Sequence, residues 1–230
     1  MGGFVLKIAV LADPHGNAVA LKAVLEDISR IGADRTVIAG DLVGYGPEPK
    51  EVIDIVRSSN AIVIRGNHDD SVVERDYAWM NNLAAFAAEW TRSILNDEYI
   101  SYLSGLNPEL ELEIEGRKIG IYHGAPGNAK EYVTEESRAR ELLREYNKDV
   151  LICGHTHVPM LVTYEGRMFL NPGGVGQPRD GNPDASYAVL SPANLGVEFR
   201  RVKYDIQKIQ RKILDAGLPN FLAARLSLGI

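Results

Sequence analysis

The sequence has 230 residues, of which 45% are hydrophobic, and a formal net charge of −6. That length and composition suffice for one full hydrophobic core, so we expect a single domain over residues 1–230. The chain has 31 acidic and 25 basic residues and no run of Lys or Arg, which argues against a basic groove for a long nucleic acid. Any bound phosphate must therefore be held by cations within a local site.

The first third of the chain alternates strand-like and helix-like segments. Residues 4–12 form a nearly continuous apolar run, which is typical of a strand buried on both faces. The elements expected next are a helix over residues 18–30 capped by Asn17, a strand over 35–39, a helix over 48–57 and a strand over 61–65. This order predicts parallel strands joined by right-handed crossovers.

The pattern then changes to a helical one over residues 71–107, which we interpret as a cap-like segment near the site. The second half returns to strands, expected over residues 110–114, 118–123, 150–153, 160–164, 168–170 and 187–190, with a helix over 134–146. Glu115-Gly116 and Glu165-Gly166 predict hairpin turns. Helical spacing over 206–213 and 221–228 ends the chain, and two β-rich halves flanked by helices indicate two packed sheets.

Short polar clusters follow the strand-like runs, and together they contain all five histidines. The clusters are Asp13-Pro14-His15, Gly40-Asp41, Gly66-Asn67-His68-Asp69, Tyr122-His123-Gly124 and Gly154-His155-Thr156-His157. One such cluster alone is more often a turn or a helix cap, but five of them at strand ends predict a divalent-metal site, because imidazole and carboxylate suit manganese, iron and zinc. In an extended segment residues two apart face the same side, so Asp13 and His15 should face one ion, as should His155 and His157.

In chain order, the segments ADPHGN, GDLVGYGP, RGNHD, YHGAP, GHTHVP and NPGGVGQPR lie within residues 12–179. This ordered set resembles the calcineurin-like metallophosphoesterase family. The resemblance implies an α/β fold, a four-layer αββα sandwich of two mixed sheets flanked by helices, with a metal site at the strand carboxyl ends. It also implies two divalent ions that share Asp41. One ion would be held by Asp13, His15, Asp41 and His157, and the other by Asp41, Asn67, His123 and His155.

Manganese is the expected metal, although iron, zinc or nickel can use the same ligands. Two divalent ions outweigh the negative charges of Asp13, Asp41 and a bridging hydroxide by about one unit, which can hold a phosphate on an acidic protein. We therefore expect metal-bound hydroxide to attack phosphorus. The resemblance gives His68 the role of stabilising the transition state and protonating the leaving oxygen.

The chain departs from the family pattern at one place. Phosphoprotein phosphatases of this superfamily typically read GDxVDRG, whereas this chain has Gly44 and Tyr45 in place of the Asp and the Arg. Because a diester carries less negative charge than a monoester, the missing Arg favours small phosphodiesters or nucleotides as substrates. Arg179 could supply a guanidinium from another loop, and Asn17 and Tyr45 are further candidate substrate contacts.

Two alternatives stay open on the sequence alone. One is a phosphomonoesterase, including a phosphoprotein or dinucleoside-polyphosphate hydrolase, and the other is a non-catalytic scaffold, which would not need a complete site. The expected partner is a small phosphate-ester substrate, and the oligomeric state is open. Cys153 is the only cysteine, and no basic leader or long apolar helix occurs, so we expect a cytoplasmic protein that does not enter a membrane.

Overall fold

The computed structural model describes residues 6–230, so residues 4 and 5 of the expected first strand lie outside the described residues. Its first sheet has the strand order β10-β9-β1-β2-β3, in which β1, β2 and β3 are parallel and β9 and β10 are antiparallel to their neighbours. These strands are β1 (Ile8–Leu11), β2 (Arg35–Ile38), β3 (Ile62–Val63), β9 (Ala185–Ser191) and β10 (Gly196–Val202). Strand β10 was not expected from the sequence.

The second sheet has the order β4-β5-β6-β8-β7 and is also mixed, with β5, β6 and β8 parallel. Its strands are β4 (Leu110–Ile114), β5 (Arg117–Ile121), β6 (Val150–Ile152), β7 (Pro159–Tyr164) and β8 (Arg167–Pro172). Both expected hairpins are confirmed, since β4 pairs with β5 and β7 with β8 in antiparallel register. At each turn the Glu-Gly pair has positive φ, the conformation of a two-residue hairpin loop.

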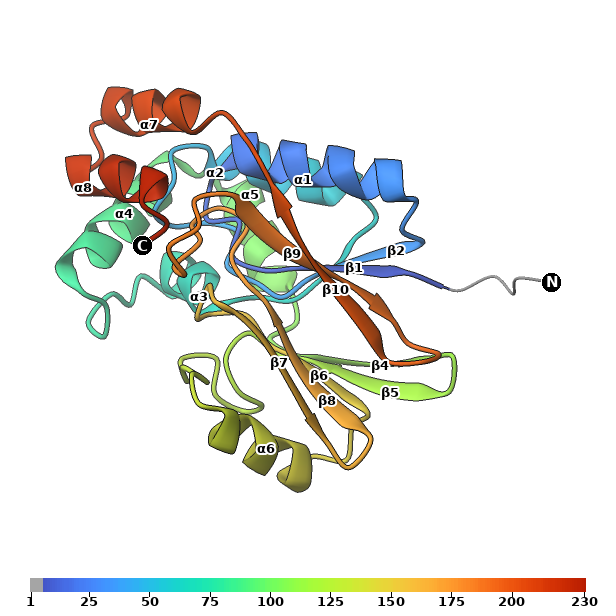
Figure 1. Ribbon diagram of the computed structural model, residues 1–230. Coiled ribbons are helices and arrows are strands. Elements are labelled where there is room, and N and C mark those ends of the chain that lie inside the picture. The colour runs from blue at the N-terminus through green and yellow to red at the C-terminus, as the bar shows by residue number, and fades with distance from the viewer. Residues whose placement is uncertain (1–5) are drawn as a thin grey trace.

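Helices cover the outer faces of the two sheets (Figure 1), which confirms the four-layer αββα sandwich. Helices α1 (Ala18–Ile31) and α2 (Pro49–Ser58) pack on the first sheet, and α6 (Glu136–Glu145) packs on the second. The inner core between the sheets follows the strand period of two. Ile8 and Val10 of β1 face the second sheet, whereas Ala9 and Leu11 face the helices.

Most of the remaining helices gather around one end of the sandwich (Figure 1). They are α3 (Asn67–Glu74), α4 (Asn82–Ile94), α7 (Ile206–Asp215), α8 (Asn220–Ala224) and the 3₁₀ turn η1 (Arg225–Ser227). Helix α5 (Asp97–Gly105) instead packs beside α2 on the outer face of the first sheet. Helices α4, α7 and α8 share a small apolar cluster that includes Tyr45. The sequence therefore predicted the helical character of residues 71–107 correctly, although the first of these helices already begins at Asn67.

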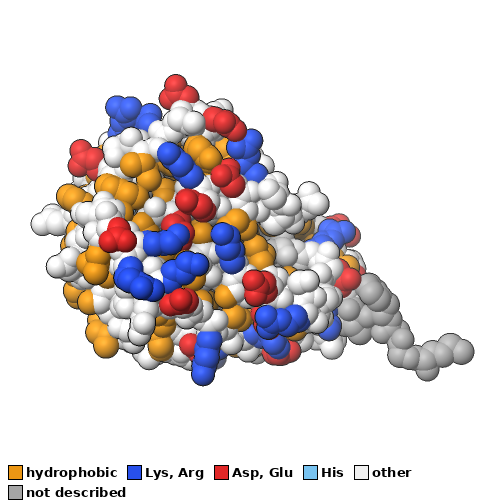
Figure 2. Space-filling view, turned by 90° about the horizontal axis from the view of Figure 1, so that it is seen from above, with side chains coloured by type: hydrophobic (Ala, Val, Ile, Leu, Met, Phe, Trp, Pro, Cys, Tyr) orange, Lys and Arg blue, Asp and Glu red, His pale blue; other side chains and the backbone are white. Residues whose placement is uncertain are grey.

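The surface agrees with the mixed charge composition. On the face that carries α1 and α7, Lys and Arg side chains lie interspersed with Asp and Glu (Figure 2). No helix within residues 6–230 combines the length and the apolar character that crossing a bilayer requires.

Candidate metal centre

The polar clusters meet at the carboxyl ends of strands from both sheets. Asp13 follows β1, Asp41 follows β2 and Asn67 opens α3 after β3, while His123 follows β5 and His155 follows β6. Backbone hydrogen bonds join these loops to one another, for example from Asp13 N to Gly40 O at 3.1 Å and from Gly154 N to His123 O at 2.7 Å. The facing edges of the two sheets thus form a single buried site, as expected for ligands in open α/β sheets.

Asp13, His15, Asp41, His155 and His157 all have φ between 45° and 67°. The left-handed conformation is uncommon for residues other than glycine, and the residues that adopt it are often found at functional sites. This finding corrects the extended-segment argument for Asp13 with His15 and for His155 with His157. Asp13 and His15 do converge, with Oδ1 and Nε2 3.8 Å apart, but sharp turns in the backbone bring them together, not the alternation of a strand. His155 and His157, in contrast, belong to different groups of donor atoms.

Each of the two carboxylates has one oxygen fixed by a backbone amide. Asp13 Oδ2 accepts from His155 N at 3.1 Å, and Asp41 Oδ1 accepts from His68 N at 2.8 Å. The other oxygens, Asp13 Oδ1 and Asp41 Oδ2, are buried and have no hydrogen-bond partner. Both free oxygens therefore point into the site with their lone pairs available.

Three imidazoles are oriented in the same manner through Nδ1. His15 Nδ1 lies 2.9 Å from Val43 O, His123 Nδ1 lies 2.7 Å from Ala39 O, and His157 Nδ1 lies 2.6 Å from Gln177 O. Because a carbonyl oxygen only accepts, each Nδ1 must carry a proton, and in the neutral form of each ring Nε2 presents a lone pair to the site. Backbone hydrogen bonds of this kind are the usual support of metal-ligating histidines.

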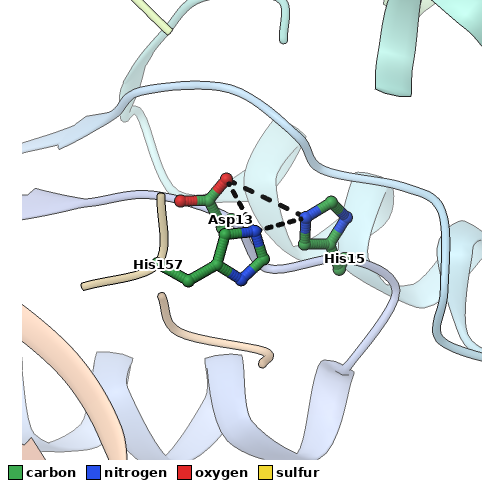
Figure 3. A group of neighbouring side chains, drawn as sticks. All are labelled: Asp13, His15 and His157. Atoms are coloured by element: carbon green, nitrogen blue, oxygen red, sulfur yellow. Dashed lines mark hydrogen bonds and ion pairs between the residues drawn. The ribbon is translucent and has the colours of Figure 1, made fainter. Parts of the chain in front are cut away.

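The nitrogen and oxygen atoms that face the site lie so close together that a positive charge is needed between them. His15 Nε2 and His157 Nε2 are 3.1 Å apart, and His157 Nε2 lies 3.5 Å from Asp13 Oδ1 (Figure 3). Two nitrogen ligands bound about 2.1 Å from one ion at nearly right angles would lie about 3.0 Å apart. Without an ion or a proton between them, the two lone pairs would repel each other.

A second group of donor atoms lies on the other side of Asp41. Its Oδ2 is 3.4 Å from His15 Nε2 and 3.2 Å from His123 Nε2, so one carboxylate oxygen faces both groups. His155 Nε2 and both polar atoms of the Asn67 amide are also buried without a hydrogen-bond partner. Buried polar atoms without partners are costly, so this arrangement of oxygen and imidazole donors fits borderline divalent cations.

Burial is the main influence on how these groups titrate. It holds the pKa of His15 and of His157 well below the usual range and lowers that of His155 to about 3, so these rings are neutral and can act as ligands. Burial, with further help from the Asp41 charge, raises the pKa of Asp13 to about 7. At His123 burial is outweighed by the Asp41 and Asp13 carboxylates, which raise its pKa to about 10.

His68 stands beside this cluster. Its ring lies 4.8 Å from the His15 ring and 4.6 Å from the Tyr45 ring, measured between centroids, and its Nδ1 is buried without a partner. A Cβ atom at Gly44, which has φ +87°, would lie 2.6 Å from His68 Nδ1. Where protein phosphatases have an Asp, this chain therefore has no room for a side chain, because the His68 ring occupies that space.

The three candidate substrate contacts lie in different surroundings. Both ends of the Asn17 amide are engaged, since Oδ1 accepts from Ala20 N at 3.0 Å and Nδ2 donates to Gly176 O at 2.9 Å, which fits a helix cap. Tyr45 is only 7% exposed, because α4, α7 and α8 pack around it. The Arg179 guanidinium lies 5.6 Å from the Tyr45 ring.

The sequence motifs did not reveal several residues that border the site. The Tyr132 ring, 53% exposed, lies 3.9 Å from the His155 ring, and Lys130 Nζ lies 4.6 Å from the ring of Trp79, which itself approaches His68. Arg225, from the C-terminal turn, approaches Tyr45 at 6.0 Å. None of them lies in a histidine- or aspartate-containing motif, so pattern reasoning had no signal for them.

Comparisons with known proteins agree with this geometry. An uncharacterized protein of Methanocaldococcus jannaschii is 35% identical, with 96% of this chain and 98% of that protein covered. Phosphodiesterase YfcE of Escherichia coli K12 is 28% identical, with 84% of this chain and 91% of the relative covered. Among solved structures, a metallophosphoesterase from Sphaerobacter thermophilus has a TM-score of 0.86 and 35% identity, covering 99% of this chain and all of that one.

A hypothetical protein from Pyrococcus horikoshii gives a TM-score of 0.89 at 25% identity, covering 98% of this chain and 99% of that one. The model of the calcineurin-like phosphoesterase superfamily domain matches residues 6–194, which hold every cluster of the site. The chain is therefore a member of the calcineurin-like phosphoesterase superfamily.

Proposed function

We propose that this protein is a dinuclear metal-dependent phosphoesterase that hydrolyses small phosphodiesters or nucleotides in the cytoplasm. The observation that carries the proposal is the convergence of unpartnered, buried donor atoms around Asp41, whose Oδ2 faces both His15 and His123. The similarity to a phosphodiesterase, YfcE, supports the diester preference.

Two groups of residues would hold the ions, with Asp41 common to both. One group is Asp13, His15, Asp41 and His157, and the other is Asp41, Asn67, His123 and His155, in agreement with two of the donor clusters in the structure. When bound, the ions, of which manganese is the expected kind, would supply Lewis-acid activation of water and neutralise charge on the phosphate.

The protein residues would do the rest of the work. The backbone amides that hold Asp13 Oδ2 and Asp41 Oδ1 fix the carboxylates before substrate arrives, so little reorganisation is needed during the reaction. His68 is next to a ligand residue and its Nδ1 has no hydrogen-bond partner, so the ring would be available to protonate the leaving oxygen. The helices over residues 71–107 would serve as a cap, since Trp79 approaches His68 at 6.2 Å between ring centroids.

One observation favours the monoesterase alternative. The Arg179 guanidinium and the His15 ring are both neighbours of the Tyr45 ring, and this guanidinium is a cation that could pair with a dianionic phosphate. A comparison of substrates decides between the two functions. Chelator-stripped protein reloaded with manganese should hydrolyse bis-p-nitrophenyl phosphate faster than p-nitrophenyl phosphate, and the opposite order would identify a monoesterase.

Two variants test the residue roles. Asp41→Asn should lose both metal content and turnover, because the carboxylate shared by the two ions is removed.

His68→Ala should keep its metal and lose about 100-fold or more in kcat, the usual contribution of a general acid. Because p-nitrophenolate leaves readily without a proton, the loss should be larger for an ester with a poorer leaving group. Absence of turnover in metal-loaded wild-type protein would instead support the scaffold alternative.

A further inference from the structure

The C-terminal helices lie outside the matched family domain, yet they pack against the site. The family model ends at residue 194, whereas α7, α8 and η1 follow it. Ile209, Leu222 and Leu226 from these helices line a small cavity together with His15 and Tyr45. One wall beside the candidate metal centre is thus formed by a segment that the family motifs do not include.

Two guanidinium groups approach the same tyrosine ring, that of Arg225 from this wall and that of Arg179 from the loop between β8 and β9. Arg179 Cζ lies 5.6 Å and Arg225 Cζ lies 6.0 Å from the centroid of the Tyr45 ring, while the His15 and His68 rings lie 4.8 Å and 4.6 Å from it. Tyr45 is therefore a common neighbour of the histidines of the site and of two cations. A substrate that extends from the histidines toward this ring would approach both arginines.

Both guanidiniums keep donors free for a ligand. Arg225 uses Nε to donate to Ile230 O, and Arg179 uses Nε and Nη2 to donate to Gln177 Oε1. Within residues 6–230, neither guanidinium forms an ion pair with a side-chain carboxylate, although acidic residues outnumber basic ones in the chain. Two cations beside one ring repel each other, and an anion that contacts both reduces that repulsion.

The electrostatic surroundings of Arg225 agree with this arrangement. Partial burial and the neighbouring Arg179 charge lower the pKa of Arg225. Arg225 also borders a groove of about 570 Å³ lined by Asn81, Asn82, Leu83 and Phe221, so a ligand can approach it from solvent.

We propose that Arg179 and Arg225 form a second phosphate subsite, which binds a phosphoryl group adjacent to the one at the candidate metal centre. The inference rests on the proposed phosphoesterase function and makes its substrate class narrower. Planar guanidiniums with free Nη donors suit the bidentate recognition of phosphate oxygens. The favoured substrates are therefore nucleotides with at least two linked phosphates, and Arg225 discriminates them from compounds with a single phosphate.

Equilibrium binding tests the subsite without turnover. Calorimetric titration of the manganese-loaded protein compares adenosine 5′-(α,β-methylene)diphosphate, which resists hydrolysis at the bridge, with adenosine 5′-monophosphate. The wild-type protein should prefer the diphosphate analogue by about tenfold or more, and Arg225→Gln should lose most of that preference, as expected when one charge-assisted contact is removed. Arg211→Gln is the matched control, because Arg211 is an exposed arginine of α7, and this variant should keep the preference.

Two results would overturn the subsite. One is a wild-type protein without any preference for the diphosphate analogue over the monophosphate, and the other is a preference of the same size in the wild type and in Arg225→Gln. If Arg225→Gln does not fold, Arg225→Lys replaces it, and it should lose part of the preference because a lysine lacks the planar fork. Hydrolysis of bis-p-nitrophenyl phosphate by the same wild-type preparation is measured in parallel. Turnover without diphosphate preference contradicts the subsite alone, whereas preference without any turnover contradicts the proposed hydrolase.

Discussion

Strained backbone at single residues gives the site its shape. Left-handed conformations at residues such as Asp13, Asp41 and His157 cost of the order of 1–3 kcal/mol each, so the surrounding structure must enforce them. The loop hydrogen bonds do so, as when His15 N donates to Asp41 O at 2.9 Å. The donor atoms are consequently in place before any ligand arrives, which is what a preorganised site requires.

Glycine at position 44 is required for the position of His68, and this can be tested. In Gly44→Ala the new methyl group would lie 2.6 Å from His68 Nδ1, so the ring or the loop must move. We expect kcat for phosphodiester hydrolysis to fall at least about tenfold, equivalent to about 1.4 kcal/mol of transition-state stabilisation, with unchanged metal content by elemental analysis.

Gly116→Ala is the matched control for this prediction. Gly116 has φ +73°, close to the +87° of Gly44, but a Cβ atom there would meet nothing within 4 Å. Both variants therefore carry comparable backbone strain, and only Gly44→Ala disturbs His68. Equal turnover in the two variants would show that the position of His68 does not limit the reaction.

Residue types and their order in the sequence predicted which side chains gather, but they could not predict how. The position of Asp13 and His15 after β1 was expected, whereas the left-handed turn that joins them depends on hydrogen bonds to Asp41 and Leu42, which are distant in sequence. Arg225 had no sequence signal at all. Its approach to Tyr45 results from the packing of the C-terminal helices, which no local pattern encodes.

At the level of elements, the strongly periodic segments were predicted well and the half-exposed ones were not. Strands β1, β6 and β8 are apolar runs buried on both faces, and their positions were correct. Strand β10 was missed because it is an edge strand whose residues are exposed or half-buried, with charges at Glu198, Arg200 and Arg201. Its pairing with β9 stabilises it more than its own composition does.

One polar network connects α1 to the β9–β10 hairpin, and it yields a stability prediction. Asp27 Oδ2 accepts from Tyr187 Oη at 2.7 Å and from Arg200 Nε at 2.9 Å, and the Asp27 side chain is only 14% exposed. Asp27→Asn should lower the free energy of unfolding by about 1.5–3 kcal/mol, the range for hydrogen bonds to charged groups. Urea denaturation at pH 7 measures the loss, and turnover should be unaffected.

The same network should weaken in acid. The hydrogen bond from Arg200 holds the pKa of Asp27 below its ordinary value of 3.8. A carboxyl group whose pKa is lower in the folded state stabilises the fold fully above its unfolded pKa, and this contribution is lost as pH falls through the folded value. The stability difference between wild type and Asp27→Asn should therefore be constant from pH 7 to about pH 5 and shrink below about pH 4. A difference that grows in acid would contradict this origin.

At the scale of the whole molecule, the fold brings a dense group of carboxylates, imidazoles and an amide into its interior. Without a bound cation, this buried polar cluster destabilises the folded state. Asp13, Asn67 and His123 are at most 1% exposed, and each of them turns at least one donor atom without a hydrogen-bond partner into the site. Bound cations would supply these partners in the folded state only, so metal binding and folding should be coupled.

Removal of metal should consequently lower the melting temperature of the entire domain. At a free metal concentration 100 times Kd, one site contributes about 2.7 kcal/mol, which for a chain of this size corresponds to a shift of about 5–10 °C. Differential scanning calorimetry of chelator-treated and manganese-reloaded protein measures the shift. Asp41→Asn should show little of this shift in melting temperature, because the removed carboxylate faces both donor groups.

Magnesium, which prefers oxygen ligands, should restore less of the melting temperature than manganese does at this imidazole-rich site. If the chelated and reloaded proteins melted together, the buried cluster would have to be stable without a cation, and the close approach of His15 Nε2 to His157 Nε2 would then require a shared proton in place of a metal ion.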